Sequence, residues 1–178
     1  MPIEKLLHET AAAAKQLVAL PDERVVKILR LVADALEAHQ EEVLEANAED
    51  LQRMDPANPK YDRLKLTADR VEAIAHDMRN VSSLPSPLDR LLNETVRPNG
   101  MVIKKISVPF GVIGVIYEAR PNVTFDVFSL CFRSGNACVL KGGSDADSSN
   151  RALVKIIRSV LMEQGVDPAA CTLLPPER

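Results

Sequence analysis

The chain has 178 residues with 46% hydrophobic content, enough to bury one core, and a formal net charge of −3. Its 22 basic residues are interspersed with 25 acidic ones, only 3% of residues are aromatic and Trp is absent, so we expect no nucleic-acid surface. The charged, helical first twenty residues predict neither a signal peptide nor a membrane span. We therefore expect a cytoplasmic protein whose cysteines are buried and reduced: Cys131, Cys138 and Cys171.

Residues 1–93 have a helical pattern. Pro21 marks one helix start, and the apolar residues from Val25 to Leu36 follow it at helical spacing. Thr67 starts another helix. Its apolar face carries Val71, Ile74 and Met78. Each helix has a single apolar stripe, so each must pack on another layer.

A β-hairpin is predicted over residues 94–108. Asn99-Gly100 separates the β-prone segments 95–97 and 101–103, and both residues tolerate the positive φ of a tight hairpin turn. An isolated two-stranded ribbon is marginally stable in water, so its strands need a partner. We expect this hairpin to be an arm used in assembly.

Buried strands and helices alternate from residue 109 onward. The apolar, β-branched run 111–117 predicts a strand buried on both faces of a parallel sheet, and residues 137–140 and 171–174 predict two more strands. Pro121 opens the first intervening helix. Its inward residues are predicted to be Val127, Leu130 and Cys131. Ser144 is predicted to cap the second helix, which ends near Gly165 and has an apolar face over residues 153–161.

This order predicts an α/β fold with N-terminal helices, a Rossmann-like doubly wound parallel sheet and a β-hairpin arm. Ligands of such sheets bind at the carboxyl ends of the strands, here the polar segments 118–122 and 141–145. The usual dinucleotide fingerprint GxGxxG is absent. We therefore expect the functional residues to lie in these two loops.

The second loop reads Lys141-Gly142-Gly143-Ser144 and lies between a strand and a helix. A cation, two permissive backbone positions and a helix N-terminus would favour an anion there, although a tight turn with a surface lysine explains the same residues. The first loop brings Glu118, Arg120 and Asn122 to the start of a helix. Arg120 can hold a carboxylate or phosphate through two hydrogen bonds, or it can pair with Glu118 on the surface.

The segment 108–151 resembles the gamma-glutamyl phosphate reductase family, also called glutamate-5-semialdehyde dehydrogenase, of the aldehyde dehydrogenase superfamily. The stretches GVIGVIYEARPNVT and SGNACVLKGGS carry the resemblance, which extends more loosely to the N-terminus. It implies NADPH-dependent reduction of gamma-glutamyl phosphate to glutamate 5-semialdehyde with phosphate release, in proline biosynthesis. A cysteine thiolate would form a thioester that the cofactor reduces. The resemblance also implies a homo-oligomer.

The resemblance also implies roles for the two loops. Lys141, Gly142, Gly143, Ser144 and Glu118 would bind the cofactor. Ser144 stands where the superfamily usually has glutamate, and the loss of that carboxylate favours NADP(H) over NAD(H). Asn122 and Arg120 would contact the oxyanion or the substrate, and no metal site is expected.

The organisation that follows has a helical part of the cofactor domain (1–93), the arm (94–108) and a Rossmann-like NADPH-binding core (109–178) that is truncated before the catalytic domain. All three cysteines fall in core segments, so the nucleophile is expected beyond Arg178 and this chain alone is expected to be inactive. Two alternatives stay open. One is a stand-alone nucleotide-binding or assembly module without catalysis. The other is the reductase half of a bifunctional kinase-reductase. The helical half follows the N-terminal methionine at once, which argues against this second alternative.

Overall fold

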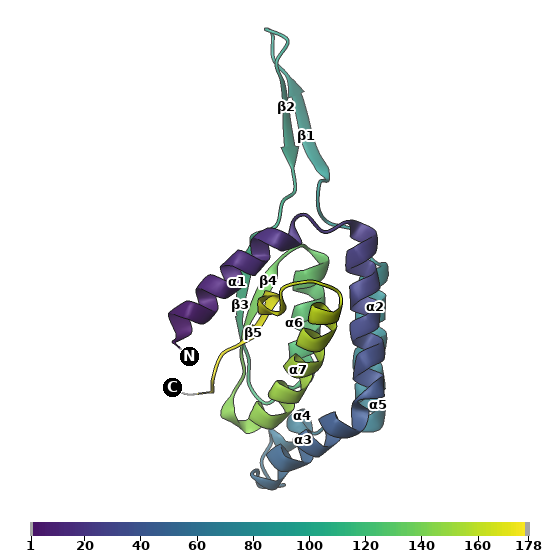
Figure 1. The fold of residues 1–178 in the computed structure, drawn as a ribbon, viewed down its shortest axis with the longest axis vertical. Helices are drawn as coiled ribbons and strands as arrows, with labels where there is room; N and C mark the ends of the chain where they lie inside the picture. The colour runs from purple at the N-terminus through teal and green to yellow at the C-terminus, as the bar shows by residue number, and fades with distance from the viewer. Residues whose placement is uncertain (1, 177–178) are drawn as a thin grey trace.

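The computed structural model describes residues 2–176 and consists of a three-stranded parallel sheet between helices, with a projecting hairpin (Figure 1). The helices are α1 (Ile3–Leu17), α2 (Asp22–Ala38), α3 (Gln40–Gln52), α4 (Tyr61–Leu64), α5 (Ala68–Ser83), α6 (Asn122–Arg133) and α7 (Asp147–Glu163). The strands are β1 (Leu91–Val96), β2 (Val102–Ile106), β3 (Val112–Ile116), β4 (Ala137–Lys141) and β5 (Cys171–Leu173). No helix within the described residues is long and apolar enough to cross a membrane.

The parallel sheet has the order β3-β4-β5, so α6 and α7 are its two crossover helices. Figure 1 shows α1 on one face of the sheet and α6 and α7 on the other, with α2 and α5 as an outer layer beyond them. The α/β architecture predicted from the sequence is confirmed. The three strands follow one another without a reversal of order, so both crossover helices lie on the same face.

Strand β4 is central and its residues from Ala137 to Leu140 are buried, as the sequence predicts. The prediction that the strand over 111–117 is buried on both faces is wrong. Strand β3 forms the edge of the sheet, with Val112 37% and Ile116 84% exposed, while Ile113 is half-buried against the core. An apolar run signals the capacity for burial on both faces, but this chain covers only one of them.

The helical half packs on the crossover helices through the predicted apolar stripes. The residues of α2 from Val25 to Leu36 that were expected to face inward are all buried. So are the predicted inward residues of α5, which begins after Thr67 because the Thr67 hydroxyl accepts a hydrogen bond from the backbone N–H of Arg70 at 3.3 Å. The Arg79 guanidinium joins α5 to α2 by donating to Asp34 at 2.7 Å and to Glu37 at 2.6 Å.

Helix α6 differs from its prediction at one position. Leu130 was expected to face inward but is 56% exposed. The buried face of α6 is centred on Phe125, Phe128 and Phe132, and Leu130 lies about 200° around the helix from Phe128 at roughly 100° per residue. The predicted apolar face of α7 is confirmed, because its five apolar residues from Leu153 to Leu161 are buried.

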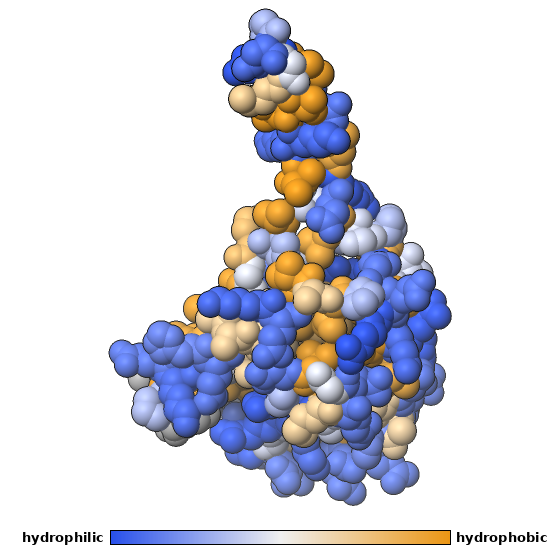
Figure 2. Space-filling view, turned by 45° about the horizontal axis from the view of Figure 1, so that its top comes forward, coloured by the Kyte–Doolittle hydropathy of each residue, from blue (hydrophilic) through white to orange (hydrophobic). Residues whose placement is uncertain are grey.

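The hairpin β1–β2 projects away from the helices and the sheet. Its register pairs Val96 with Val102 and Leu91 with Ile106, so the strands extend further than the residues expected from the sequence. Every residue of both strands is exposed. Figure 2 shows apolar side chains along the ribbon and at its base. The large apolar residues exposed in this region are Leu91, Leu92, Val96, Met101, Val102, Ile103, Ile106, Val108 and Phe110.

Candidate functional site

The carboxyl ends of β3 and β4 meet at one cavity of about 420 Å³, which we call the loop cavity. Tyr117 and Glu118 line it from the end of β3, and residues 141–145 line it from the loop after β4. The structure therefore brings together all five residues predicted to bind the cofactor. Lys60, from the segment before α4, also lines this cavity and was not predicted.

The backbone of Gly142 approaches a buried polar network. A Cβ atom at this position would lie 2.2 Å from Nδ2 of Asn150, so only glycine fits without a shift. Oδ1 of Asn150 accepts from the Thr124 hydroxyl at 3.0 Å, and the Thr124 hydroxyl is 2.6 Å from the Tyr117 hydroxyl. Burial is the main cause that raises the pKa of Tyr117 to about 12, so its hydroxyl keeps its proton at neutral pH. This network fixes the floor of the loop cavity.

Gly143 has a different environment. Its φ of −73° and ψ of 158° are open to any residue, and a Cβ atom would meet nothing nearer than 3.7 Å, at Cα of Glu118. Of the two glycines, Gly142 is required by a close contact, whereas neither the backbone angles nor the space at Gly143 require glycine.

The N-terminus of α7 is capped by a side chain from another helix. Ser144 was expected to cap it, but Ser144 begins a short 3₁₀ turn and α7 starts at Asp147. The buried carboxylate of Asp50, on α3, accepts from the backbone N–H groups of Ser148 at 3.1 Å and Ser149 at 2.8 Å. The first backbone N–H groups of α7 thus have a carboxylate of the protein as their partner, whereas the sequence predicted a bound anion at this helix end.

Asn47 completes this capping cluster. Its amide donates to the Ser149 hydroxyl at 3.0 Å and to the backbone carbonyl of Leu64 at 2.8 Å. Neither Asn47 nor Asp50 was predicted from the sequence. They follow Val43 at i+4 and i+7 on the buried face of α3, and polar residues at such positions are a signal of buried hydrogen bonding.

The first loop divides at Ala119. This residue is 2% exposed and has a φ of 43°, in the left-handed region that costs a residue with a side chain about 1–2 kcal/mol. Glu118, before it, lines the loop cavity and forms an ion pair with Lys60 at 3.1 Å. Arg120 and Asn122, after it, line a different cavity. The alternative of a surface pair between Arg120 and Glu118 is therefore wrong.

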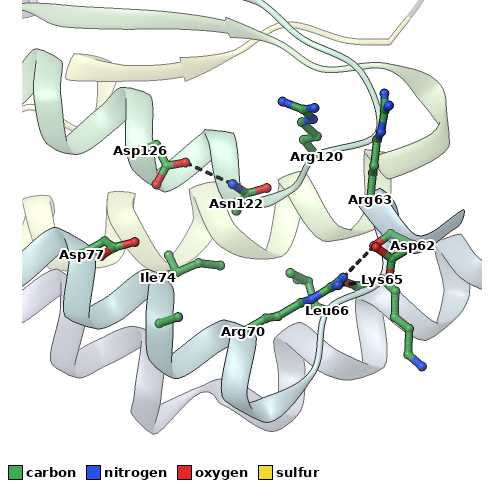
Figure 3. Close-up of a pocket in the computed structure, with 11 residues that line it drawn as sticks. Asp62, Arg63, Lys65, Leu66, Arg70, Ile74, Asp77, Arg120, Asn122 and Asp126 are labelled. Atoms are coloured by element: carbon green, nitrogen blue, oxygen red, sulfur yellow. Dashed lines mark hydrogen bonds and ion pairs between the residues drawn. The ribbon is translucent and has the colours of Figure 1, made fainter. Parts of the chain in front are cut away.

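The second cavity has a volume of about 360 Å³ and lies between α4, α5 and the start of α6 (Figure 3). We call it the arginine cavity, because Arg63, Arg70 and Arg120 line it. The Asn122 amide donates to Asp126 one turn further along α6, at 3.1 Å. Burial, above all, raises the pKa of Asp126 from its ordinary value.

All three cysteines are buried, as the sequence predicts. Burial raises the pKa of Cys131 to about 12, and a hydrogen bond with Cys171 together with burial raises the pKa of Cys138 well above its ordinary value. A thiol that keeps its proton is a poor nucleophile. None of the three lines either cavity.

The fold is that of the aldehyde dehydrogenases. A solved structure of an NAD-dependent benzaldehyde dehydrogenase from Corynebacterium glutamicum superposes with a TM-score of 0.67 at 19% identity, over 93% of this chain and 34% of that one. This likeness concerns the fold alone. None of the protein-family models compared with the sequence matches it.

Among proteins of this fold, the chain is similar over its whole length to the N-terminal portion of gamma-glutamyl phosphate reductases, which confirms the resemblance found in the sequence. It is 69% identical over its whole length to the gamma-glutamyl phosphate reductase of Parabacteroides distasonis and covers 43% of that protein. The solved structure of this enzyme from Thermotoga maritima gives a TM-score of 0.91 at 31% identity, over 96% of this chain and 42% of that one. The chain thus spans less than half the length of its relatives.

Proposed function

We propose that the protein containing this chain reduces gamma-glutamyl phosphate to glutamate 5-semialdehyde with NADPH, releasing phosphate, in cytoplasmic proline biosynthesis. The observation that carries the proposal is the 69% identity over the whole chain to a protein named for this activity. The two cavities at the strand ends support it, because a reductase of this kind needs adjacent sites for a cofactor and an anionic substrate.

The loop cavity fits the phosphate-bearing end of the cofactor. Lys60 and Lys141 line this cavity and supply positive charge, and the Gly142-Gly143 backbone has no side chain to fill it. Lys141 also donates to the backbone carbonyl of Pro175, which orients its ammonium group. NADPH, when bound, would supply the hydride for reduction. The part of these residues is to hold the cofactor and to anchor the loop between β4 and α7.

The preference for NADPH over NADH rests on Lys141 and Ser144. Ser144 adds no carboxylate to the loop cavity, although Glu118 and Asp145 do line its wall. Lys60 is paired with Glu118, and each reduces the effect of the other on a 2′-phosphate. Lys141 is therefore the cation that favours the more anionic cofactor.

The test measures dissociation constants of NADPH and NADH for the full-length protein by fluorescence titration. Lys60→Gln and Lys141→Ala should weaken NADPH by about tenfold to a hundredfold, the worth of one charge-assisted hydrogen bond, and NADH by less. Ser144→Glu should shift the preference toward NADH. If the ratio of the NADPH and NADH dissociation constants is unchanged in all three variants, this cavity does not recognise the 2′ position.

We also propose that the hairpin joins copies of the protein. Its two strands are exposed on both faces and carry a contiguous set of apolar side chains, which a ribbon of two strands cannot bury by itself. Replacing residues 101–107 of the full-length protein by a short polar loop should give a monomer in sedimentation. An unchanged association state would refute the role of the arm.

A further inference from the structure

The arginine cavity holds two guanidinium groups without a protein partner. Arg63 comes from α4 and Arg120 from the loop before α6. Within residues 2–176, neither side chain takes part in a hydrogen bond or an ion pair. Arg70 differs, because it donates to the carboxylate of Asp62 at 3.0 Å and to two backbone carbonyls. Both residues are exposed, and two unpaired guanidiniums at one cavity can bind a carboxylate or phosphate that enters it.

The opposite end of the same cavity is acidic. Figure 3 shows Asp77 and Asp126 on one side and Arg63 and Arg120 on the other. Asp126 is half-buried and receives a hydrogen bond only from the neutral Asn122 amide, with no cation bound to it in the described chain. Asp77 adds negative charge nearby and raises the pKa of Asp126 further. A half-buried carboxylate in this setting is stabilised by a cation that enters the cavity.

The floor between the two ends is apolar. Leu66 and Ile74, from the segment before α5 and from α5 itself, are 7% and 6% exposed and line the cavity. A short aliphatic chain can therefore lie across the floor while charged groups reach both ends. Attraction between charges is stronger where protein replaces water on one side.

We propose that the arginine cavity recognises the substrate as an amino acid, with its α-ammonium group at Asp126 and Asp77 and an anionic group at Arg63 and Arg120. This inference rests on the proposed function and deepens it, because it assigns the residues that distinguish an amino-acid aldehyde from a plain one. Asn122 lies between the two ends. The anionic group is the phosphoryl group, because the α-carboxylate shares its carbon with the ammonium group and cannot lie at the opposite end of the aliphatic chain.

The experiment uses the full-length protein in the oxidative direction, with NADP⁺ and phosphate. Glutamate 5-semialdehyde is compared with 5-oxopentanoate, which has the same carbon chain and carboxylate but no ammonium group. Asp126→Asn should lower the ratio of kcat/KM for these two substrates by about tenfold or more, the worth of a charge-assisted hydrogen bond. Asp69→Asn is the matched control, because Asp69 lies at the exposed start of α5 and does not line the cavity.

The basic end is tested with Arg63→Gln and Arg120→Gln. A higher KM for phosphate would support a phosphoryl site at the two arginines. A higher KM for the aldehydes with unchanged phosphate dependence would overturn that site. If the KM values for phosphate and for both aldehydes are unchanged in both variants, the basic subsite is wrong. Thermal unfolding and NADPH affinity of each variant show whether the fold is intact.

The two proposals fail in different ways. If the unmodified protein turns over neither aldehyde, the proposed function is wrong. If it oxidises both aldehydes and Asp126→Asn lowers their kcat/KM values by equal factors, the function stands and recognition of the ammonium group by Asp126 is wrong.

Discussion

Replacing Gly142 by alanine tests how tightly the loop after β4 is held against α7. The new Cβ would lie 2.2 Å from Nδ2 of Asn150, and Asn150 is 1% exposed, so it cannot swing into solvent. Relief requires either a shift of the loop or loss of the hydrogen bond from Thr124 to Asn150. Overpacking costs about 1–3 kcal/mol and a lost hydrogen bond about 1 kcal/mol, so either route predicts a destabilisation of roughly 1–3 kcal/mol.

Gly143→Ala is the matched control, because its Cβ would meet nothing nearer than 3.7 Å. It should be neutral or should stabilise by up to about 1 kcal/mol, since alanine reduces the freedom of the unfolded chain. Urea denaturation gives both values. Asn150→Ala should lower the free energy of unfolding less in the Gly142→Ala protein than in the unmodified protein, because it also removes the clash. Equal stabilities of the Gly142 and Gly143 variants would refute the contact.

Three further predictions concern single side chains. Asp50→Ala should destabilise the protein by about 2–4 kcal/mol in urea denaturation, because the N-terminus of α7 loses its cap and buried N–H groups lose their acceptor. Asp126→Asn should stabilise the unliganded protein at neutral pH. The raised pKa of Asp126 means that its ionised form opposes folding, so this gain should disappear as the pH falls through the folded and then the unfolded pKa. With a pKa of about 12, Cys131 should resist iodoacetamide at pH 8 until urea is added, as peptide mapping would show.

The helices and the alternation of strands and helices along the chain could be predicted because their signals are local. The apolar stripe of α2 repeats at helical spacing, and all its predicted inward residues are buried. The same kind of signal misplaced Leu130, because it is apolar but lies off the stripe centred on Phe128. Local pattern identifies an element well, whereas the direction of one side chain depends on the neighbours that the fold supplies.

The membership of the two cavities could be predicted only in part. Sequence order places Glu118 and Lys141 at neighbouring strand ends, and they do share the loop cavity. It also places Glu118 next to Arg120, yet the left-handed backbone at Ala119 directs them into different cavities. A positive φ at alanine has no sequence signal, because most residues with this angle are glycine or asparagine.

The residues missed altogether come from the helical half, which supplies one wall of each cavity. Lys60 reaches the loop cavity, Arg63 reaches the arginine cavity, and Asp50 caps α7 from across the helix layer. Contacts between residues 50 and 149 or 60 and 118 are set by packing, which periodicity does not reveal. The Asp50 carboxylate occupies the N-terminus of α7, so this helix end is not open to an anionic ligand. Under the proposed function, the lysines of the loop cavity are the cations that would hold the cofactor phosphates.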